Sequence, residues 1–265
     1  MSNKYTEQAL QESRSFGVRR IPTLRPLGWL AAGWADLMNC PVPGLVHGLA
    51  SALFGALLYW AAHDQFWLLA GTFSGFLLVA PVVATGLYAV SRALERGESP
   101  GLGTALRAWK PDDHRLVFFG LLLALAGTGW VLTSAALISS QLPGQVHTPL
   151  DFLRLVVVAN DGHLFELWLG LGALLAAPVF ASSVVTLPLL LDRQVGVLAA
   201  VFISWRVVME HPVPMALWGA LLMGLSLLGM ASMMVGLVVV VPWLAHASWH
   251  AYRDLVNTQG LTERN

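Results

Sequence analysis

Charged residues are scarce in this sequence. Of its 265 residues, only 11% are Asp, Glu, Lys or Arg, while 56% are hydrophobic. An ordinary soluble domain carries about 25% charged residues. The charges are also unevenly placed, because long apolar segments hold almost none of them and short connections hold the rest. This distribution excludes an ordinary soluble domain and predicts a polytopic membrane protein embedded in a lipid bilayer.

Cysteine is almost absent, since Cys40 stands alone and cannot form a disulfide within one chain. The N-terminal segment is polar and lacks the apolar core of a cleavable signal peptide. We therefore expect the first membrane helix to direct insertion. Neither end of the sequence carries a lipidation signature.

Several sequence signatures of enzymes are also missing. The chain has no phosphate-binding Gly-rich loop, no Gly-x-Gly-x-x-Gly, no Gly-x-Ser-x-Gly and no His-Glu-x-x-His. No carboxylate falls in the middle of a predicted span, which counts against a proton-coupled carrier. No soluble segment is long enough to hold an active site, and the basic residues follow membrane topology. We therefore expect neither catalysis nor nucleic-acid binding.

The apolar segments predict an all-α fold, a polytopic membrane helical bundle of six transmembrane helices arranged as three hairpins. Residues 213–252 are too long for one span, because one helix of that length would reach roughly 60 Å, about twice the bilayer core. We place a turn at residues 229–232. The predicted spans cover residues 44–62, 65–90, 116–140, 164–191, 213–228 and 233–254. They belong to a transmembrane domain, residues 26–255, between polar cytoplasmic tails at residues 1–25 and 256–265.

Apolar residues at helical spacing predict amphipathic interfacial helices beside the spans. One such helix covers residues 26–39, before the first span, and a second covers residues 102–110. Residues 198–209 repeat the pattern, with Ser204 and Arg206 on the polar side. We expect these helices to lie in the headgroup layer on the cytoplasmic face.

Basic residues set the predicted orientation. In a six-span arrangement, 14 of the 15 Lys and Arg residues fall on one side of the membrane, and Arg154 alone falls on the other. The positive-inside rule then places both termini in the cytoplasm. A five-span arrangement would send Arg253 and Arg264 outside and fits the count less well.

Two predicted spans carry Gly-x-x-x-Gly pairs, Gly44 with Gly48 and Gly71 with Gly75. Small residues at this spacing let helix backbones approach closely. The motif is frequent in Gly-rich spans, so it indicates close packing without identifying the partner helix. We assign these four glycines to helix–helix interfaces.

Three predicted span ends resemble one another. Residues 81–125 resemble residues 182–225, and residues 81–92 align without gaps on residues 242–253. All copies have the same orientation, which indicates a parallel repeat of hairpins, although apolar segments also resemble one another by chance. The equivalent positions at the span ends are Ser91-Arg92, Asp192-Arg193 and Tyr252-Arg253.

The stretch Pro242-Trp-Leu-Ala-His-Ala-Ser-Trp-His-Ala-Tyr-Arg253 resembles the DUF2189 family of predicted integral membrane proteins, which is found widely in proteobacteria. Further similar segments are residues 29–37, 187–193 and 200–205, His211-Pro212 and Trp218. The resemblance covers most of residues 27–255, and His211-Pro212 departs from an expected Asn-Pro. It implies a multi-pass protein of the bacterial inner membrane and assigns no activity.

Three histidines form a candidate metal or haem site. His246 and His250 stand one helical turn apart, so both project from one face of the last predicted span. His47 lies near the start of the first span, at a similar depth. Neutral imidazoles bind haem iron, Zn²⁺ and Cu²⁺. The alternative is that these residues anchor helices at the interface or form hydrogen bonds between helices.

Charged and aromatic residues close the predicted spans, and we assign them to structural or interface roles. They are Asp192, Arg193, Trp249, Tyr252 and Arg253. The aromatic rings suit the headgroup layer. The charged residues could pair across helices or meet anionic headgroups. The alternative for the arginines is that they extend to the membrane surface without a specific partner.

The role that best fits these features is non-catalytic. We expect a small subunit, assembly factor or scaffold of a larger membrane complex, with the lipid bilayer and other membrane subunits as partners. One alternative is a haem- or metal-binding membrane protein that uses His246, His250 and His47. A second alternative is a small-solute permease, which would need a polar cavity at mid-membrane.

Overall fold

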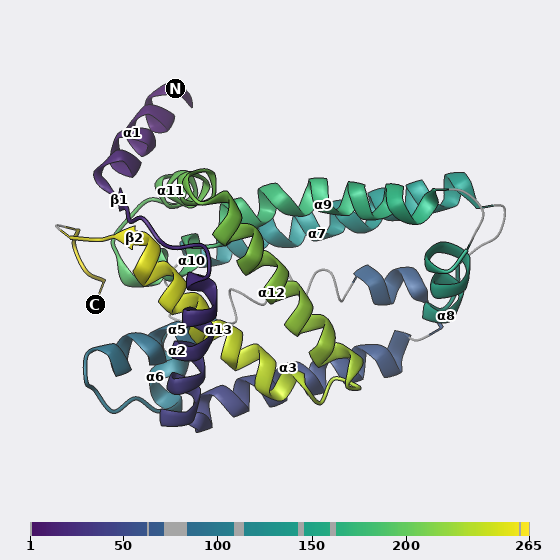
Figure 1. The fold of residues 1–265 in the computed structure, drawn as a ribbon, viewed down its shortest axis with the longest axis horizontal. Coiled ribbons are helices and arrows are strands. Elements are labelled where there is room, and N and C mark those ends of the chain that lie inside the picture. Colours follow the sequence, from purple (N-terminus) through teal and green to yellow (C-terminus); the bar gives the residue numbers. More distant parts are fainter. Residues whose placement is uncertain are drawn as a thin grey trace. The chain divides into compact units, whose positions relative to one another are not determined.

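The computed structural model describes residues 2–62, 64–71, 84–108, 114–142, 146–159, 163–259 and 261–264 (Figure 1). These residues are mostly helical, as the sequence predicts. The chain packs as two compact units, each assembled from separate chain segments. Unit 1 consists of Met1–Ala52, Pro81–Val117 and Phe180–Asn265, and unit 2 consists of Leu53–Ala80 and Phe118–Val179.

Helices dominate both units, and proline explains several of their boundaries. Pro26, Pro149 and Pro212 stand in the first turns of α2, α8 and α12, where a missing N–H removes no helical hydrogen bond. The helices are α1 (Ser2–Ser15), α2 (Arg25–Asn39), α3 (Pro41–Ala62), α5 (Thr85–Glu95), α6 (Leu102–Arg107), α7 (His114–Gln141), α8 (Pro149–Phe152), the π-helix η1 (Leu153–Val157), α9 (Leu164–Ser183), α10 (Thr186–Asp192), α11 (Val197–Glu210), α12 (Pro212–Ala231) and α13 (Leu237–Leu255). The strands are β1 (Gly17–Val18) and β2 (Val256–Asn257).

Four helical segments within the described residues are long and apolar enough to cross a membrane. They are Pro41–Ala62, His114–Gln141, Leu164–Asp192 and Pro212–Ala231. They match four of the predicted spans, and an all-α membrane protein is therefore confirmed. The predicted span at residues 65–90 includes residues 72–83, which lie outside the described residues. The last predicted span corresponds to α13, which is not among the four, so six spans and three hairpins stay predictions.

The turn between α12 and α13 lies slightly later than predicted. Helix α12 ends at Ala231 and α13 begins at Leu237, so the turn covers residues 232–236 instead of 229–232. Met233 and Met234 have positive φ values of 55° and 68° there. The Ser232 hydroxyl donates to the Gly229 carbonyl at 2.8 Å and accepts from the Gly236 N–H at 2.8 Å, which stabilises the reversal.

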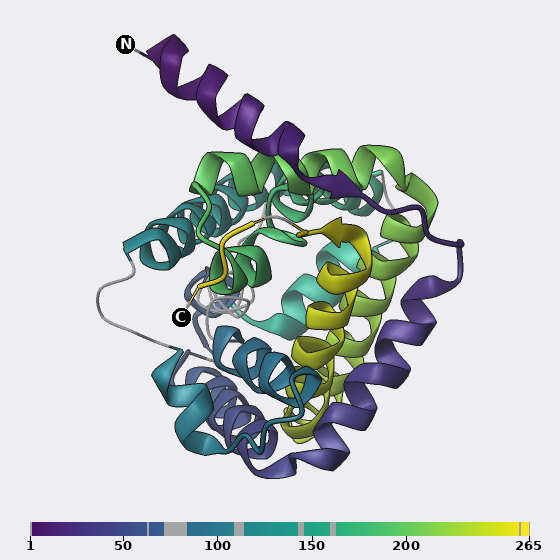
Figure 2. The same cartoon turned by 90° about the vertical axis from the view of Figure 1, so that its left-hand side faces the viewer.

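Close packing joins α2 and α3 to α13 in unit 1. Helices α2 and α13 lie side by side (Figures 1 and 2). A Cβ atom at Gly33 would collide with the backbone of Ala247, and one at Gly48 would collide with the backbone of Val238. Gly44 is also tightly packed, against Leu37 and Pro242 of α2 and α13. Small residues therefore permit these helices to approach, and the predicted interfacial helix at 26–39 is packed along α13.

Of the second Gly-x-x-x-Gly pair, Gly71 lies in unit 2, where a Cβ atom would meet the Val131 side chain at 3.8 Å. That distance is an ordinary van der Waals contact, so the position does not require glycine in the way that Gly48 does. Its predicted partner Gly75 lies outside the described residues.

Both predicted polar tails contain regular structure. Helix α1 packs beside α11 (Figure 2), and β1 pairs antiparallel with β2, with Val18 opposite Val256. This pairing could not be predicted from the sequence, because two residues per strand carry no periodicity. The side chain of Arg206 donates to the Phe16 carbonyl at 3.1 Å, and the Gly196 N–H donates to Glu12 at 3.2 Å. These contacts fix the N-terminal segment on α11.

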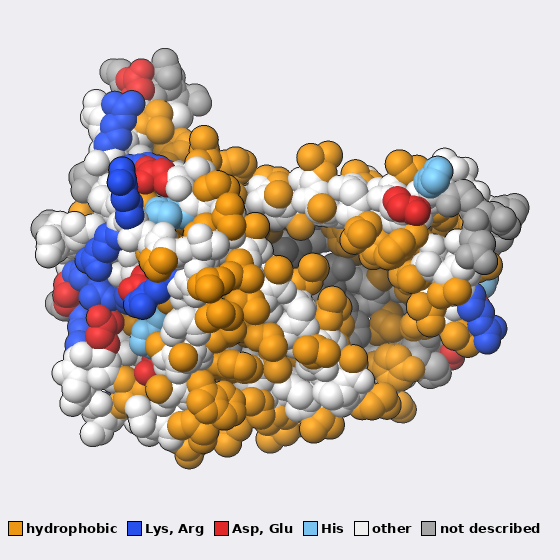
Figure 3. Space-filling model, in the orientation of Figure 1, with side chains coloured by type: hydrophobic (Ala, Val, Ile, Leu, Met, Phe, Trp, Pro, Cys, Tyr) orange, Lys and Arg blue, Asp and Glu red, His pale blue; other side chains and the backbone are white. Residues whose placement is uncertain are grey.

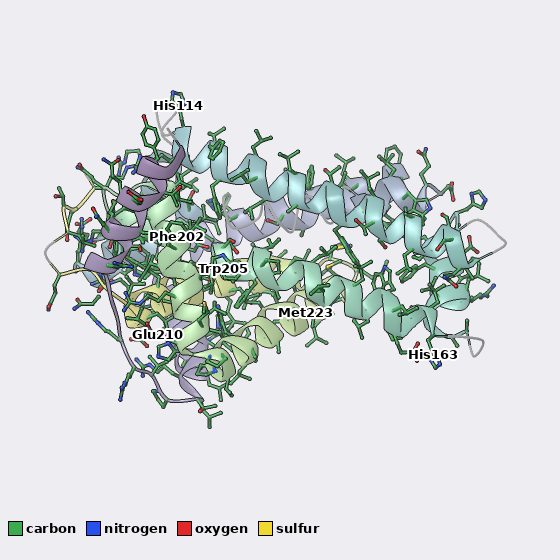
Figure 4. All side chains as sticks on the ribbon, turned by 90° about the horizontal axis from the view of Figure 1, so that it is seen from above. His114, His163, Phe202, Trp205, Glu210 and Met223 are labelled. Carbon is green, nitrogen blue, oxygen red and sulfur yellow. The ribbon has the colours of Figure 1, made fainter. Side chains whose placement is uncertain are left out.

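Helix α11 forms where the sequence predicts it, but its buried face differs from the predicted one. Ser204 was expected on the polar side and is fully buried, where its hydroxyl accepts from the Val185 N–H at the break between α9 and α10. Trp205 is more exposed, and its Nε1–H donates to Ser182 at 2.9 Å. Figure 4 shows Trp205 and Glu210 along this helix. The inward face of α11 therefore consists of Ala199, Ala200, Ile203, Ser204 and Val207.

Unit 2 is held by apolar and aromatic packing. One of its core clusters is formed by the buried side chains of Ile138, Val146 and Val156. Around them Phe66 stacks on Phe152, with ring centroids 5.1 Å apart, and Phe152 meets Trp168 edge-on at 5.2 Å. The indole N–H of Trp168 donates to Ser134 at 2.6 Å, which connects α9 to α7.

Candidate functional site

Charged side chains of unit 1 gather where α5, α10 and α13 end. On the face shown in Figure 3, Lys, Arg, Asp and Glu side chains concentrate near the C-terminal segment of this unit. The three helices contact one another pairwise, and Figure 2 views their ends. These are the three span ends that the predicted repeat makes equivalent. Two polar clusters are found here, one around Asp192 and one around His246.

Asp192 is the centre of the first cluster, and its side chain is only 3% exposed. The Tyr252 hydroxyl donates to its Oδ2 at 2.7 Å. Arg193 lies 3.2 Å from the carboxylate, Arg253 3.7 Å and Arg92 3.9 Å. A buried carboxylate is stable only when charges and donors surround it. This cluster therefore ties the ends of α5, α10 and α13 together.

The geometry of this cluster agrees with the predicted repeat. The arginines at the three equivalent positions, Arg92, Arg193 and Arg253, all lie within 4 Å of one carboxylate. Asp192 and Tyr252 occupy the position before the arginine in their copies, and they bind each other. Equivalent residues of a parallel repeat meet in this way when the copies surround a common axis. Among the alternatives left open by the sequence for Asp192, Arg193 and Arg253, these contacts correspond to pairing across helices.

The C-terminal segment completes the first cluster. Glu263 binds Arg193 at 3.0 Å and Arg96 at 2.6 Å. The Arg264 N–H donates to the Asp192 carbonyl at 2.9 Å. The hydrogen bond and charge of Arg193, followed by the charge of Arg96, lower the pKa of Glu263 below its usual value. The predicted polar tail is thus bonded to the helix ends.

Trp249 and Tyr252 are buried within unit 1, 1% and 0% exposed. Their rings contact each other edge-on at 5.4 Å. The Trp249 indole donates to Glu95 at 3.1 Å, and Arg253 binds the same carboxylate at 2.9 Å. Sequence periodicity could not show that both aromatic residues face neighbouring helices.

The second cluster is a chain of hydrogen bonds from α13 to α2 and α5. His250 Nε2 lies 2.8 Å from Asp36 Oδ2. The Ser91 hydroxyl lies 2.7 Å from the same carboxylate oxygen and 2.7 Å from His246 Nδ1. His246 is completely buried, whereas the side chain of His250 is 27% exposed. The network therefore runs from the surface to the interior of unit 1.

The network fixes where its protons lie. Burial, the largest influence, raises the pKa of Asp36, but hydrogen bonds from His250 and Ser91 and the nearby imidazole charges bring it below its usual value. An ionised carboxylate only accepts hydrogen bonds. Ser91 therefore donates its single proton to Asp36 and accepts the Nδ1–H of His246. In the neutral imidazole, Nε2 of His246 then carries a lone pair.

That lone pair is the most unusual feature of the site. Nε2 of His246 is buried and has no hydrogen-bond partner among the described residues. The nitrogen lies beside α3, since a Cβ atom at Gly44 would be 3.7 Å from it. His47 on α3 interacts electrostatically with His246. The Nδ1 of His47 lies 2.8 Å from the Pro43 carbonyl, so its Nε2 carries the lone pair in the neutral ring.

The three predicted metal ligands thus have different environments. His246 and His47 are buried and near each other, while Nε2 of His250 is bonded to Asp36. Within the described ranges, no group of three or more His, Cys, Asp or Glu side chains could hold a metal ion. Metal binding by His246, His250 and His47 stays a prediction.

Sequence reasoning missed Asp36 and Ser91. Asp36 lies in the helix that the sequence predicts in the headgroup layer, residues 26–39, yet its side chain is only 13% exposed. A signal was present, because Trp29, Gly33 and Asp36 recur at helical spacing and face α13 together. Ser91 precedes Arg92 at a position that the predicted repeat makes equivalent to Asp192 and Tyr252, which is a signal for a buried polar contact.

A pocket of about 450 Å³ opens onto the exposed end of the network. Asp36 and His250 line it, together with Asp254, Arg25 and Arg253. Asp254 accepts hydrogen bonds from Arg25 at 2.5 Å and from the Trp29 indole at 2.7 Å. The three acidic side chains of this pocket, Asp36, Glu95 and Asp254, are therefore paired with basic or N–H groups of α2 and α13.

The comparisons with known proteins agree with the membrane interpretation. Neither the curated proteins nor the solved structures include a match to the chain. The family model described as "Predicted integral membrane protein (DUF2189)" matches residues 68–192. Of the segments on which the resemblance was based, this range includes Leu187 to Asp192, and the stretch at 242–253 lies beyond it. The chain is therefore similar to the DUF2189 family over residues 68–192, and the resemblance found in its sequence is confirmed there.

Proposed function

We propose that this protein is a six-span protein of the bacterial inner membrane, with both termini in the cytoplasm and a non-catalytic role. It acts as a subunit, assembly factor or scaffold of a larger membrane complex. The observation that carries this proposal is the Asp192 cluster. Its carboxylate, arginines and tyrosine bind one another and the C-terminal segment, so they hold helix ends in place.

The surfaces of the candidate spans support a role in assembly. In each of the four, no more than half of the most apolar window is buried within the chain. On α3, for example, Leu49, Leu53 and Trp60 are between 50% and 75% exposed. Such faces pack against lipid tails or against helices of another membrane protein.

Crosslinking in native membranes tests the assembly role. The protein would be crosslinked in intact membranes, extracted in mild detergent and separated on a native gel. We expect a species larger than the chain in its micelle, with other membrane subunits identified in it by mass spectrometry. A single band of uncomplexed protein after crosslinking contradicts the proposal.

The single cysteine makes the topology simple to test. In a Cys40→Ser background, His163→Cys and Glu98→Cys each introduce one thiol at an exposed position. A membrane-impermeant maleimide should label His163→Cys in intact spheroplasts and Glu98→Cys only after permeabilisation. Labelling of both from the same side is incompatible with six spans.

The lone pair of His246 favours metal or haem binding as a second candidate function. Ser91 and Asp36 orient the ring as outer partners orient metal-ligating histidines in other proteins. The purified protein would be examined by absorption spectroscopy and elemental analysis, with His246→Ala and the exposed His114→Ala as matched variants. Bound metal or haem that His246→Ala loses and His114→Ala retains supports this function. A colourless, metal-free protein of unchanged stability rejects it.

A further inference from the structure

A second pocket in unit 1 lies between α5, α6 and the C-terminal segment. Its volume is about 220 Å³. Four arginines line it, Arg92, Arg96, Arg107 and Arg264, against one acidic residue, Glu98. Neither the Asp192 cluster nor the histidine network requires such a cavity. A positively charged cavity of this size raises the question of which anion it accepts.

Carboxylates near this pocket compensate its arginines only in part. Arg96 pairs with Glu263, but Glu263 also binds Arg193. Arg92 lies 3.9 Å from Asp192, which it shares with two other arginines. Burial, together with the charge of Arg96, lowers the pKa of Arg92 below its usual value. Among the side chains that the structure describes, positive charge is therefore in excess at the pocket.

The arginines differ in how firmly they are held. Arg92 Nη1 donates to the carbonyls of Leu191 and Arg264 at 3.3 and 3.2 Å, and Arg264 Nη1 donates to the Leu190 carbonyl at 3.2 Å. These bonds fix two guanidinium groups at the wall. Arg107, at the end of α6, forms no ion pair with any described residue. Its guanidinium retains its donors for a ligand.

A hydroxyl adds a neutral donor to the pocket. Thr104 Oγ1 accepts the Gly101 N–H at 3.3 Å, so its own proton is available to an acceptor. Guanidinium groups and a hydroxyl around one cavity match the oxygen atoms of a phosphate group, which arginine binds in bidentate fashion. A carboxylate has two oxygens and uses fewer of these donors.

We propose that this pocket binds a phosphate group, carried either by the headgroup of an anionic phospholipid or by a soluble phosphorylated molecule. The pocket adjoins the inner ends of α5 and α10, where the proposed topology places the cytoplasmic leaflet. An acidic headgroup is therefore within reach. This binding does not depend on whether the protein is a scaffold.

Two binding measurements on the full-length protein distinguish the sources. In the first, native mass spectrometry counts phosphatidylglycerol and phosphatidylcholine retained by the protein in a zwitterionic detergent. In the second, glycerol 3-phosphate is titrated while the melting temperature is followed. Both use the wild type, Arg107→Gln and the control Arg20→Gln, which removes an exposed arginine outside the pocket. Because Arg107 has no ion-pair partner among the described residues, its variant should melt like the wild type.

We expect Arg107→Gln to weaken phosphate binding about fivefold, because each basic residue near an anionic headgroup contributes about that factor. Arg20→Gln should bind like the wild type. A loss confined to phosphatidylglycerol identifies a lipid site, and a loss confined to glycerol 3-phosphate identifies a soluble ligand. Equal weakening by both variants, or no binding of either probe above phosphatidylcholine, overturns the proposal. If Arg107→Gln is unstable, Thr104→Val replaces it with the same expected selectivity.

Discussion

The two units of this protein both bury apolar side chains, but only in unit 1 do charged side chains connect several helix ends, among the described residues. Unit 1 connects its helix ends through charges, with three arginines around the side chain of Asp192, and through the Asp36–Ser91–His246 chain. Unit 2 packs through apolar and aromatic side chains, such as Ile138 and Trp168.

This difference determines how each unit tolerates change. Hydrogen bonds and ion pairs depend on direction and on exact partners, so one missing group leaves another unsatisfied. Apolar packing depends mainly on volume. We therefore expect unit 1 to respond to the loss of polar groups of unchanged size, and unit 2 to respond to the loss of volume.

The largest effect should follow Asp192→Asn. This change keeps the size of the side chain but removes the charge of the buried carboxylate 3.2 Å from Arg193. Breaking a buried charge pair on one side costs about 4 kcal/mol of unfolding free energy. Unfolding in mild detergent measures it, with the exposed Asp64→Asn in unit 2 as the control. Equal stability of the two variants would remove the distinction between the units.

Ile138→Ala should destabilise unit 2 by about 3 kcal/mol, because the truncation leaves a cavity in its core. Ile138→Val removes one methylene and should cost about 1 kcal/mol. The same unfolding assay compares them. If Ile138→Ala proves as mild as Ile138→Val, volume does not control unit 2.

Tyr252→Phe removes only the hydroxyl that donates to Asp192. We expect a loss of about 2 kcal/mol, the usual contribution of a hydrogen bond to a charged acceptor. The exposed Tyr5→Phe serves as the matched control and should behave like the wild type. A wild-type melting temperature for Tyr252→Phe would show that the arginines alone hold Asp192.

The smallest expected effect is a loss of stability at low pH. The pKa of Asp36 is lower in the folded protein than in the unfolded chain, so its stabilising contribution is present above the unfolded value of about 4. That contribution disappears as the pH falls through the lower folded value. Melting temperatures between pH 7 and pH 3 should therefore decline more steeply for the wild type than for Asp36→Asn. If the melting temperatures of the two proteins fall in parallel, the ionisation of Asp36 is not coupled to folding.

Much of the fold could be predicted from the sequence because it depends on local patterns. Apolar length predicts the four candidate spans, and helical spacing predicts α6 and α11. The alignment of three span ends even indicates which arginines meet at Asp192. Each of these features can be recognised within one continuous segment or by comparing similar segments of the chain.

The remaining features depend on partners that are distant in the sequence. Asp36 bonds to His250, 214 residues away, and its helix looks amphipathic until α13 covers it. Ser204 has no polar sequence neighbour that explains its burial, because its partner is the Val185 N–H at a helix break. No periodicity reports such contacts, since they arise only after the helices have packed.

Unit 1 is assembled from segments that are far apart in the sequence, and this constrains when it can fold during synthesis of the chain. Its segments emerge from the ribosome at different times, with α2 first, α5 later, and α13 with Glu263 last. Until α13 is inserted, Asp36 and Ser91 lack the histidines that bind them, and Asp192 lacks Tyr252 and Arg253. Water, headgroups or another protein must bind these polar groups in the interval. Unit 1 therefore completes these polar contacts only when synthesis of the chain is nearly finished.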